Sequence, residues 1–192
     1  MDTKGIVICG VGGQGSLLAS KRLGRVLMNE GYDIKVSEVH GMSQRGGSVI
    51  TYVRYGEKVY SPVIQTGEAD YIISFERIEA ARYASLLKED GVLNTNTQRI
   101  DPMTDNTGAA EYPTEILDEL RAKNVKLEAF DALSLAIEAG SAKAVNIVLM
   151  GQLAKHFHIA YDKWIEAIEQ LVKPQFVEMN KKAFALGYEF TA

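Results

Sequence analysis

Cysteine is nearly absent, since the chain of 192 residues contains only Cys9. One thiol cannot form an internal disulfide, and an iron–sulfur cluster normally needs about four cysteine ligands. Cys9 lies in the apolar run from Gly5 to Gly10, a setting that favours a small buried strand residue over a catalytic one. We therefore expect any redox metal that this protein depends on to lie on another polypeptide.

Long apolar runs and an excess of basic residues are lacking as well. No run reaches the ~20 residues of a membrane-spanning helix, and the formal net charge of -4 gives no reason to expect nucleic acid or an anionic membrane as a partner. The first residues lead straight into a strand-like segment, so we expect no signal peptide and a cytoplasmic location. The 46% hydrophobic and 24% charged residues are typical of a globular protein, and we predict one domain, residues 1–192.

The first half of the chain predicts an α/β fold with a Rossmann-like, mostly parallel sheet. A βαβ unit opens it, with strands at 6–9 and 33–39. The helix between them has an apolar face made of Leu17, Leu18, Leu23, Val26 and Leu27. Residues 48–55 are rich in β-branched and aromatic residues, and a turn and a short strand at 58–60 follow. This pattern predicts a β-hairpin inserted into the α/β framework.

The second half continues the alternation and then becomes helical. The expected strands and helices lie at 69–75, 77–87, 92–94, 114–123 and 126–130, with a polar loop at 98–113. Asp131 and Ser141 are expected to cap two helices. The second helix, to about residue 156, is apolar nearly all round, which predicts a buried helix. We expect a helical C-terminal region from about 141 to 192.

A glycine-rich loop joins the first strand to the first helix. Its candidate ligand-binding residues are Gly10, Gly12, Gly13, Gln14 and Gly15. The spacing G-x-G-x-x-G after a strand and before a helix is typical of loops whose backbone approaches a phosphate closely. In a dinucleotide site, Glu38 at the end of the second strand would bind the ribose.

The same loop has a second interpretation, as a tight turn that only packs a strand against a helix. Gly13-Gln14 adds a fourth glycine and a polar amide where many dinucleotide sites have small or apolar residues. The pattern is compatible with a phosphate-bearing ligand and does not require NAD. Both interpretations stay open on the residues alone.

The segment Glu38–Ser48 is the second candidate site. Its candidate ligand-binding residues are Ser43, Gln44, Arg45, Gly46 and Gly47. We expect it at the same edge of the sheet as the glycine loop, where open α/β sheets bind ligands. His40 could act as a general base, or only pack and form hydrogen bonds. Arg45 could clamp a phosphate or carboxylate, or form a salt bridge to a partner subunit.

Together, the two segments resemble the gamma-type module of the pyruvate/2-oxoacid:ferredoxin oxidoreductase family. The resemblance spans almost the whole chain, including Ala69-Asp70 before a strand and Asn146–Gly151 late in the sequence. The two motifs in this order and spacing are far more specific than either alone. The separate chain and its length are most similar to the beta subunit of the indolepyruvate ferredoxin oxidoreductases.

The resemblance implies a complex that oxidatively decarboxylates a 2-oxoacid, an aryl pyruvate such as indolepyruvate. The acyl group is captured as a coenzyme A thioester, and electrons pass to ferredoxin. In the family, thiamine diphosphate, magnesium and iron–sulfur clusters belong to other subunits or domains. This sequence agrees, since it has no Gly-Asp-Gly motif and no cysteine cluster. The resemblance thus implies a large thiamine- and iron–sulfur-binding partner, and a contact with coenzyme A is open.

Two rival functions remain. One is a stand-alone dinucleotide-dependent oxidoreductase, which the glycine loop and Glu38 favour but the lack of a recognisable acid/base pair does not. The other is a non-enzymatic nucleotide-binding regulatory module. We expect no metal site, because His156 and His158 lack a third ligand at suitable spacing and are predicted to be surface residues at a helix end. Trp164 and Phe176 are expected in the core or at a subunit interface.

Overall fold

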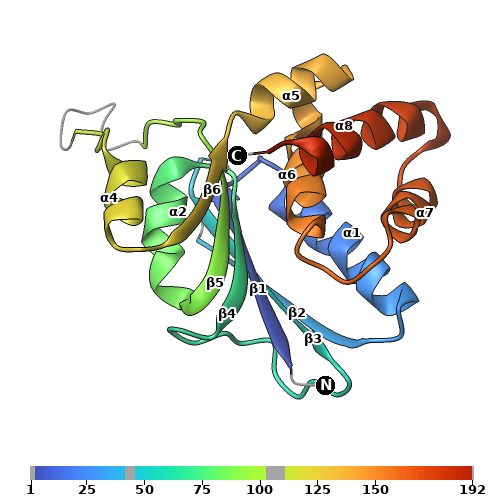
Figure 1. Cartoon of the computed structure of the whole chain (residues 1–192), viewed down its shortest axis with the longest axis horizontal. Coiled ribbons are helices and arrows are strands. Elements are labelled where there is room, and N and C mark those ends of the chain that lie inside the picture. The colour runs from blue at the N-terminus through green and yellow to red at the C-terminus, as the bar shows by residue number, and fades with distance from the viewer. Residues whose placement is uncertain (1–2, 42–45, 103–110, 192) are drawn as a thin grey trace.

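A computed structural model describes residues 3–41, 46–102 and 111–191. A six-stranded sheet forms the middle of the molecule, with helices on both faces (Figure 1). The strands are β1 (Lys4–Val11), β2 (Asp33–His40), β3 (Ser48–Gly56), β4 (Ala69–Ser74), β5 (Leu87–Asn96) and β6 (Lys126–Phe130). The helices are α1 (Ser16–Asn29), α2 (Arg77–Tyr83), α4 (Ile116–Ala122), α5 (Ala132–Ala139), α6 (Val145–Ala154), α7 (Tyr161–Leu171) and α8 (Val177–Glu189).

The strand order is β2-β3-β1-β4-β5-β6. Strands β1, β4, β5 and β6 are parallel, whereas β3 runs antiparallel to both β1 and β2. Strand β2 therefore has the same direction as β1 but is separated from it by β3. The predicted α/β class and mostly parallel sheet are confirmed.

Strand β3 was predicted to form a hairpin with residues 58–60, but it pairs with a different segment. Residues 58–60 form no strand; β3 pairs with β2, where Val36 lies opposite Val53. The N–H group of Val59 donates to Asp33 at 2.9 Å, and the Val59 side chain is buried while Tyr60 is exposed. The residues after β3 thus anchor a loop, and the antiparallel insertion is the β2–β3 pair.

The two faces of the sheet carry different helices (Figure 1). Helices α1, α5, α6, α7 and α8 enclose the larger hydrophobic cluster, which includes Ile6, Ile8 and Phe75. Helices α2 and α4 cover the smaller cluster, to which Val7 and Cys9 belong. Alternate residues of β1 point to opposite faces, as the period of a strand requires. Cys9 is fully buried, as predicted.

Helix α1 differs in part from its predicted apolar face. Leu23, Val26 and Leu27 are buried, but Leu17 and Leu18 are 42% and 51% exposed. These two leucines occupy the first turn, beyond the edge of the helix layer, so they border open cavities instead of the core. The predicted apolar face of this helix is therefore buried from Leu23 onward and exposed in its first turn.

The helical C-terminal region is confirmed, and α6 is buried on every side. Helices α6 and α8 cross so closely that a Cβ atom on Gly151 would lie 2.2 Å from the Phe184 carbonyl oxygen, and one on Gly187 would lie 2.0 Å from that of Val148. Backbones can approach this closely only where side chains are missing. Asp131 and Ser141 accept the predicted capping hydrogen bonds.

Trp164 is buried, but Phe176 is 46% exposed. His156 corrects another expectation, because its side chain is only 20% exposed and its Nε2 lies 3.1 Å from a Glu128 carboxylate oxygen. His158 is exposed, as predicted. Within the described residues, no helix combines the length and apolar character needed to cross a bilayer.

Candidate functional site

The two predicted motifs lie side by side at the carboxyl ends of β1 and β2. The N–H group of Gly12 donates to the carbonyl of Gly47 at 2.8 Å, and that of Gly46 donates to the carbonyl of Gly12 at 3.2 Å. The insertion of β3 between β1 and β2 causes this contact, because β3 begins where β1 ends. The expectation that both loops emerge at one edge agrees with this geometry.

The backbone of the glycine loop serves more than one purpose. A Cβ atom on Gly10 would lie 2.9 Å from both Gln14 Oε1 and Phe75 Cβ, so this glycine permits close packing. Gly13 and Gly15 have φ angles of 103° and 94°, which side chains with a Cβ rarely adopt. Nothing lies within 4 Å of a Cβ position on Gly13. The loop is therefore packed at Gly10 and open at Gly13.

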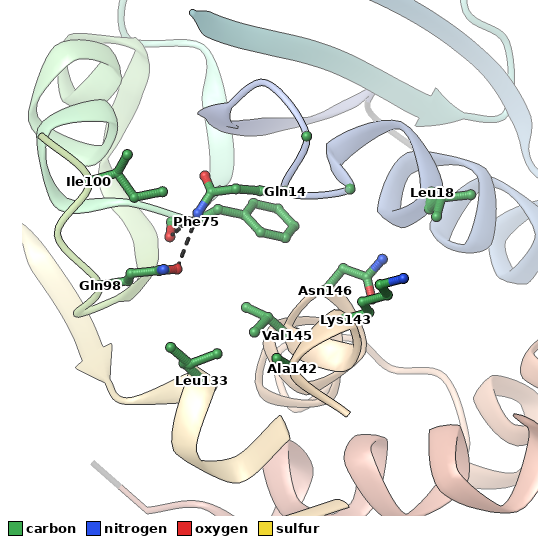
Figure 2. A pocket seen from close by; sticks show the side chains of 12 residues that line it. Gln14, Leu18, Phe75, Gln98, Ile100, Leu133, Ala142, Lys143, Val145 and Asn146 are labelled. Atoms are coloured by element: carbon green, nitrogen blue, oxygen red, sulfur yellow. Dashed lines mark hydrogen bonds between the residues drawn. The ribbon is translucent and has the colours of Figure 1, made fainter. Parts of the chain in front are cut away.

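Gln14 is a structural residue in this loop (Figure 2). Its Oε1 accepts from the N–H group of Val11 at 2.7 Å. Its Nε2 donates to the carbonyl of Phe75 at 3.2 Å and to Oε1 of Gln98 at 3.3 Å. These bonds tie together the chain segments that leave β1, β4 and β5. The Gln14 amide is thus occupied inside the protein, which supports the packing interpretation for this residue.

A cavity of about 390 Å³ opens between the glycine loop and the start of α6. Figure 2 shows Gln14 and Gln98 on one side of it and Lys143 and Asn146 on the other. The first turn of α1 borders this cavity, and its N-cap, Gly15, provides no side-chain hydrogen bond. A helix N-terminus without a capping side chain leaves N–H groups free for an anion.

A second cavity of about 240 Å³ lies on the β2 side of the glycine loop. Leu17, Glu38 and His40 line it. Glu38 accepts from Thr51 Oγ1 at 3.4 Å, and the exposed His40 places Nδ1 3.2 Å from the carbonyl of Gly41. Among the described residues, His40 forms no hydrogen bond with a nucleophile or a second acid, so the geometry assigns it no catalytic role. The N–H group of Gly12, which a dinucleotide phosphate would need, is already bonded to Gly47.

Three of the predicted site residues, Ser43, Gln44 and Arg45, lie outside the described residues. Their neighbours Gly46 and Gly47 are described and contact the glycine loop through Gly12. The site assignments for these three residues stay predictions.

The sequence reasoning missed a buried carboxylate next to the site. Glu76 is 1% exposed and accepts from the N–H groups of Ile78 at 2.6 Å and Ile100 at 3.2 Å, and from the Tyr112 hydroxyl. Burial, reinforced by the hydrogen bond to Glu76, raises the pKa of Tyr112. Glu76 therefore fixes the segment that carries Gln98 and Ile100 into the cavity wall. Glu76 is also the N-cap of α2, but glutamate is not among the usual capping residues, so no local pattern indicated its role.

The described residues do not fit an iron–sulfur cluster. Burial raises the pKa of Cys9 to about 12, so the thiol stays protonated, and its Sγ donates to the Glu79 carbonyl at 3.6 Å. Nowhere in the described ranges do three or more His, Cys, Asp or Glu side chains gather as metal ligands would.

Comparisons with known proteins agree with this geometry. A family model described as pyruvate ferredoxin/flavodoxin oxidoreductase matches residues 5–190. The chain belongs to this family. A member from Thermococcus kodakarensis, "Indolepyruvate oxidoreductase subunit IorB", is 46% identical, and the alignment covers 97% of this chain and 95% of that protein. The family predicted from the two motifs is confirmed.

Two solved structures have the same fold. The keto/oxoacid ferredoxin oxidoreductase gamma subunit of Geobacter sulfurreducens superposes with a TM-score of 0.72 at 24% identity, covering 97% of this chain and 96% of that one. The 2-oxoglutarate:ferredoxin oxidoreductase of Magnetococcus marinus, with 2-oxoglutarate, coenzyme A and succinyl-CoA bound, gives 0.72 at 17% identity. This chain covers 97% of its own length but only 30% of that larger chain.

Proposed function

We propose that this chain is the small subunit of an indolepyruvate-type 2-oxoacid:ferredoxin oxidoreductase. The reaction converts the 2-oxoacid and coenzyme A to an acyl-CoA and carbon dioxide, and the two electrons released pass to ferredoxin. The observation that carries the proposal is the 46% identity to the indolepyruvate oxidoreductase subunit over 97% of the chain. The substrate class and the electron acceptor come to this chain from that similarity.

We assign thiamine diphosphate, magnesium and the iron–sulfur clusters to a large partner subunit. The buried, protonated thiol of Cys9 supports this division for the clusters. The length of the Magnetococcus marinus chain supports it too, because a fold like this one makes up only 30% of that chain. The residues of this chain act by binding and by shaping the cavity wall.

Coenzyme A fits the described residues in one respect. The open backbone at Gly13, the uncapped start of α1 and the ammonium group of Lys143 offer donors for a phosphate. Bound there, coenzyme A would supply the thiol that accepts the acyl group. Arg45 stays a proposed second contact, either to this phosphate or to the large subunit. We keep one domain, residues 1–192, and a cytoplasmic location as predictions.

Reconstitution tests the proposal. The purified chain alone should be colourless and inactive, and viologen reduction should begin only when the large subunit is added. With the complex, kcat/KM for indolepyruvate should exceed the values for pyruvate and 2-oxoglutarate. Stoichiometric iron or thiamine diphosphate in the isolated chain would contradict the division between subunits. Reduction of NAD by the isolated chain would favour the dinucleotide alternative.

A further inference from the structure

A largely apolar groove of about 340 Å³ lies next to the glycine-loop cavity. It runs between α1, the start of α6 and the segment that joins α7 to α8. Leu18, Leu171 and Phe176 line it and are 51%, 39% and 46% exposed. Single exposed apolar residues are common, but several gathered in one groove indicate a binding surface.

The charged residues that line the groove are all basic. They are Arg22, Lys143 and Lys173, and no carboxylate is among the described lining residues. Nη1 of Arg22 is shielded from solvent and has no hydrogen-bond partner within the described structure. An arginine side chain stays protonated in proteins, and a buried cationic donor without an acceptor is unfavourable. Nη1 of Arg22 therefore lacks an acceptor, and the simplest one that an occupant of the groove can supply is a carboxylate.

The groove continues into the cavity beside the glycine loop, because Leu18, Lys143 and Asn146 line both. Figure 2 shows these three side chains at the end of the cavity opposite Gln98 and Ile100. An occupant of the groove would thus also form part of the cavity wall.

We propose that this groove is the docking surface for a segment of the large partner subunit. The segment presents a carboxylate to Arg22 and an apolar side chain to Leu171 and Phe176. The inference rests on the proposed function, since it names the surface through which the two subunits meet.

Charge and polarity favour this occupant over two others. A symmetric dimer through the groove would place the same basic patch of two copies face to face, which repels. A free phosphate ligand would satisfy Arg22 but leave the apolar walls uncovered. A segment with both a carboxylate and an apolar side chain provides an acceptor for Arg22 and also covers the apolar walls of the groove.

Arg22→Met tests the charged half of the contact. This change keeps most of the aliphatic length and removes the guanidinium. We expect the dissociation constant of the complex to rise at least tenfold, about 1.4 kcal/mol. The melting temperature of the isolated chain should be unchanged or higher, because the unpaired nitrogen is gone. Arg25→Met is the matched control, since Arg25 is an exposed residue of the same helix that does not line the groove.

Phe176→Ser tests the apolar half, and Tyr60→Ser is its control. Tyr60 is 88% exposed in the loop between β3 and β4, away from the groove lining. We expect Phe176→Ser to weaken assembly at least tenfold and Tyr60→Ser to leave it unchanged. Both measurements use the complex with the large subunit, by titration calorimetry.

The outcomes separate this inference from the proposed function. If the wild-type chain does not assemble with the large subunit, the proposed function fails. If it assembles and neither Arg22→Met nor Phe176→Ser changes the dissociation constant, the inference alone is overturned. A raised KM for coenzyme A with unchanged assembly would identify a phosphate site instead. Loss of self-association by the isolated chain would identify a dimer surface, and either result overturns the inference.

Discussion

Gln14 shows how one side chain determines what a glycine loop can do. From its position in the motif, its amide is a candidate for contact with a ligand. In the structure, the amide holds Val11, Phe75 and Gln98. The last two partners are 61 and 84 positions away along the chain, so no local pattern could have revealed them. The backbone of Gly13, for which the described part of the chain offers no such partners, is the more accessible part of the loop.

Gln14→Leu should destabilise the chain, since leucine is similar in size but cannot form any of these bonds. It would leave the N–H group of Val11 without its acceptor and the carbonyl of Phe75 with only the donor from Asn96. We expect a cost of roughly 1–3 kcal/mol in the free energy of unfolding. Denaturant unfolding measures the change. Gln170→Leu is the control, because the Gln170 side chain accepts an exposed hydrogen bond from Asn29, and its loss should change stability little. Equal effects of the two changes would contradict the structural role of Gln14.

At the scale of elements, the features that depend on neighbouring residues were predicted well, whereas the order of the strands in the sheet was not. The caps at Asp131 and Ser141 and the buried helix α6 all depend on neighbours within a few residues. The partner of β3 depends on which distant strand offers a free edge. Val53 packs in the larger cluster with Ile6, and this fixes β3 between β1 and β2. Periodicity alone does not contain that information.

The candidate site was likewise predictable in part. The meeting of the two motifs was predictable, because β1 and β2 have the same direction and their carboxyl ends share an edge. The backbone bonds between Gly12 and Gly47 were not, because they depend on where β3 starts. Glu76 was also missed, since its importance comes from Tyr112 and Ile100, which are far away in the sequence.

Gly15, in the turn from β1 into α1, and Gly24, inside α1, provide a paired test. Replacement by alanine should change the free energy of unfolding in opposite directions at the two positions. Gly15→Ala places a Cβ at a φ of 94° and 3.0 Å from Nδ2 of Asn146. We expect a loss of roughly 1–3 kcal/mol in the free energy of unfolding. Gly24→Ala, in the interior of the same helix, meets nothing within 4 Å. Because alanine is the better helix former, Gly24→Ala should gain roughly 0.5–1 kcal/mol. An unchanged or raised stability of Gly15→Ala would contradict the conformation of the turn, whereas a loss from Gly24→Ala would contradict the open space at that helix position.

At the scale of the whole molecule, acidic groups stabilise the end of the sheet opposite the site. Asp70, at the start of β4, accepts from Lys4 of β1 at 3.0 Å, from the Gly5 N–H group at 2.8 Å and from Lys88 of β5 at 2.8 Å. Burial on its own would raise the pKa of Asp70, but the bonds from Lys88, Gly5 and Lys4 lower it overall. The stability of this end of the sheet therefore depends on pH, and the candidate site at the opposite end is not involved.

Glu128 adds a second acid-sensitive contact, with residues in and just after α6. Burial would raise the pKa of Glu128, whereas hydrogen bonds from His156 and Gln152 lower it overall. Both carboxylates thus bind fewer protons in the folded state than in the unfolded state as the pH falls. Linkage requires that the molecule lose stability over that range.

Asp70→Asn should remove part of this pH dependence. A carboxylate whose folded-state pKa is lowered contributes stability above its unfolded pKa of about 3.9, and that stability is lost as the pH falls through the folded value. We expect the variant to be less stable than the wild type by roughly 1–3 kcal/mol at about pH 7, because both lysines lose their charged acceptor. The difference should shrink as the pH falls below the unfolded pKa and through the lowered folded-state pKa, where the wild-type carboxyl group also becomes protonated. Denaturant unfolding over this pH range measures both values.

Asp118→Asn is the control, since Asp118 pairs with Arg121 but its side chain is 80% exposed, and such pairs contribute little. A deficit for Asp70→Asn that stays constant with pH would mean that the shape of the side chain, and not its charge, stabilises this edge.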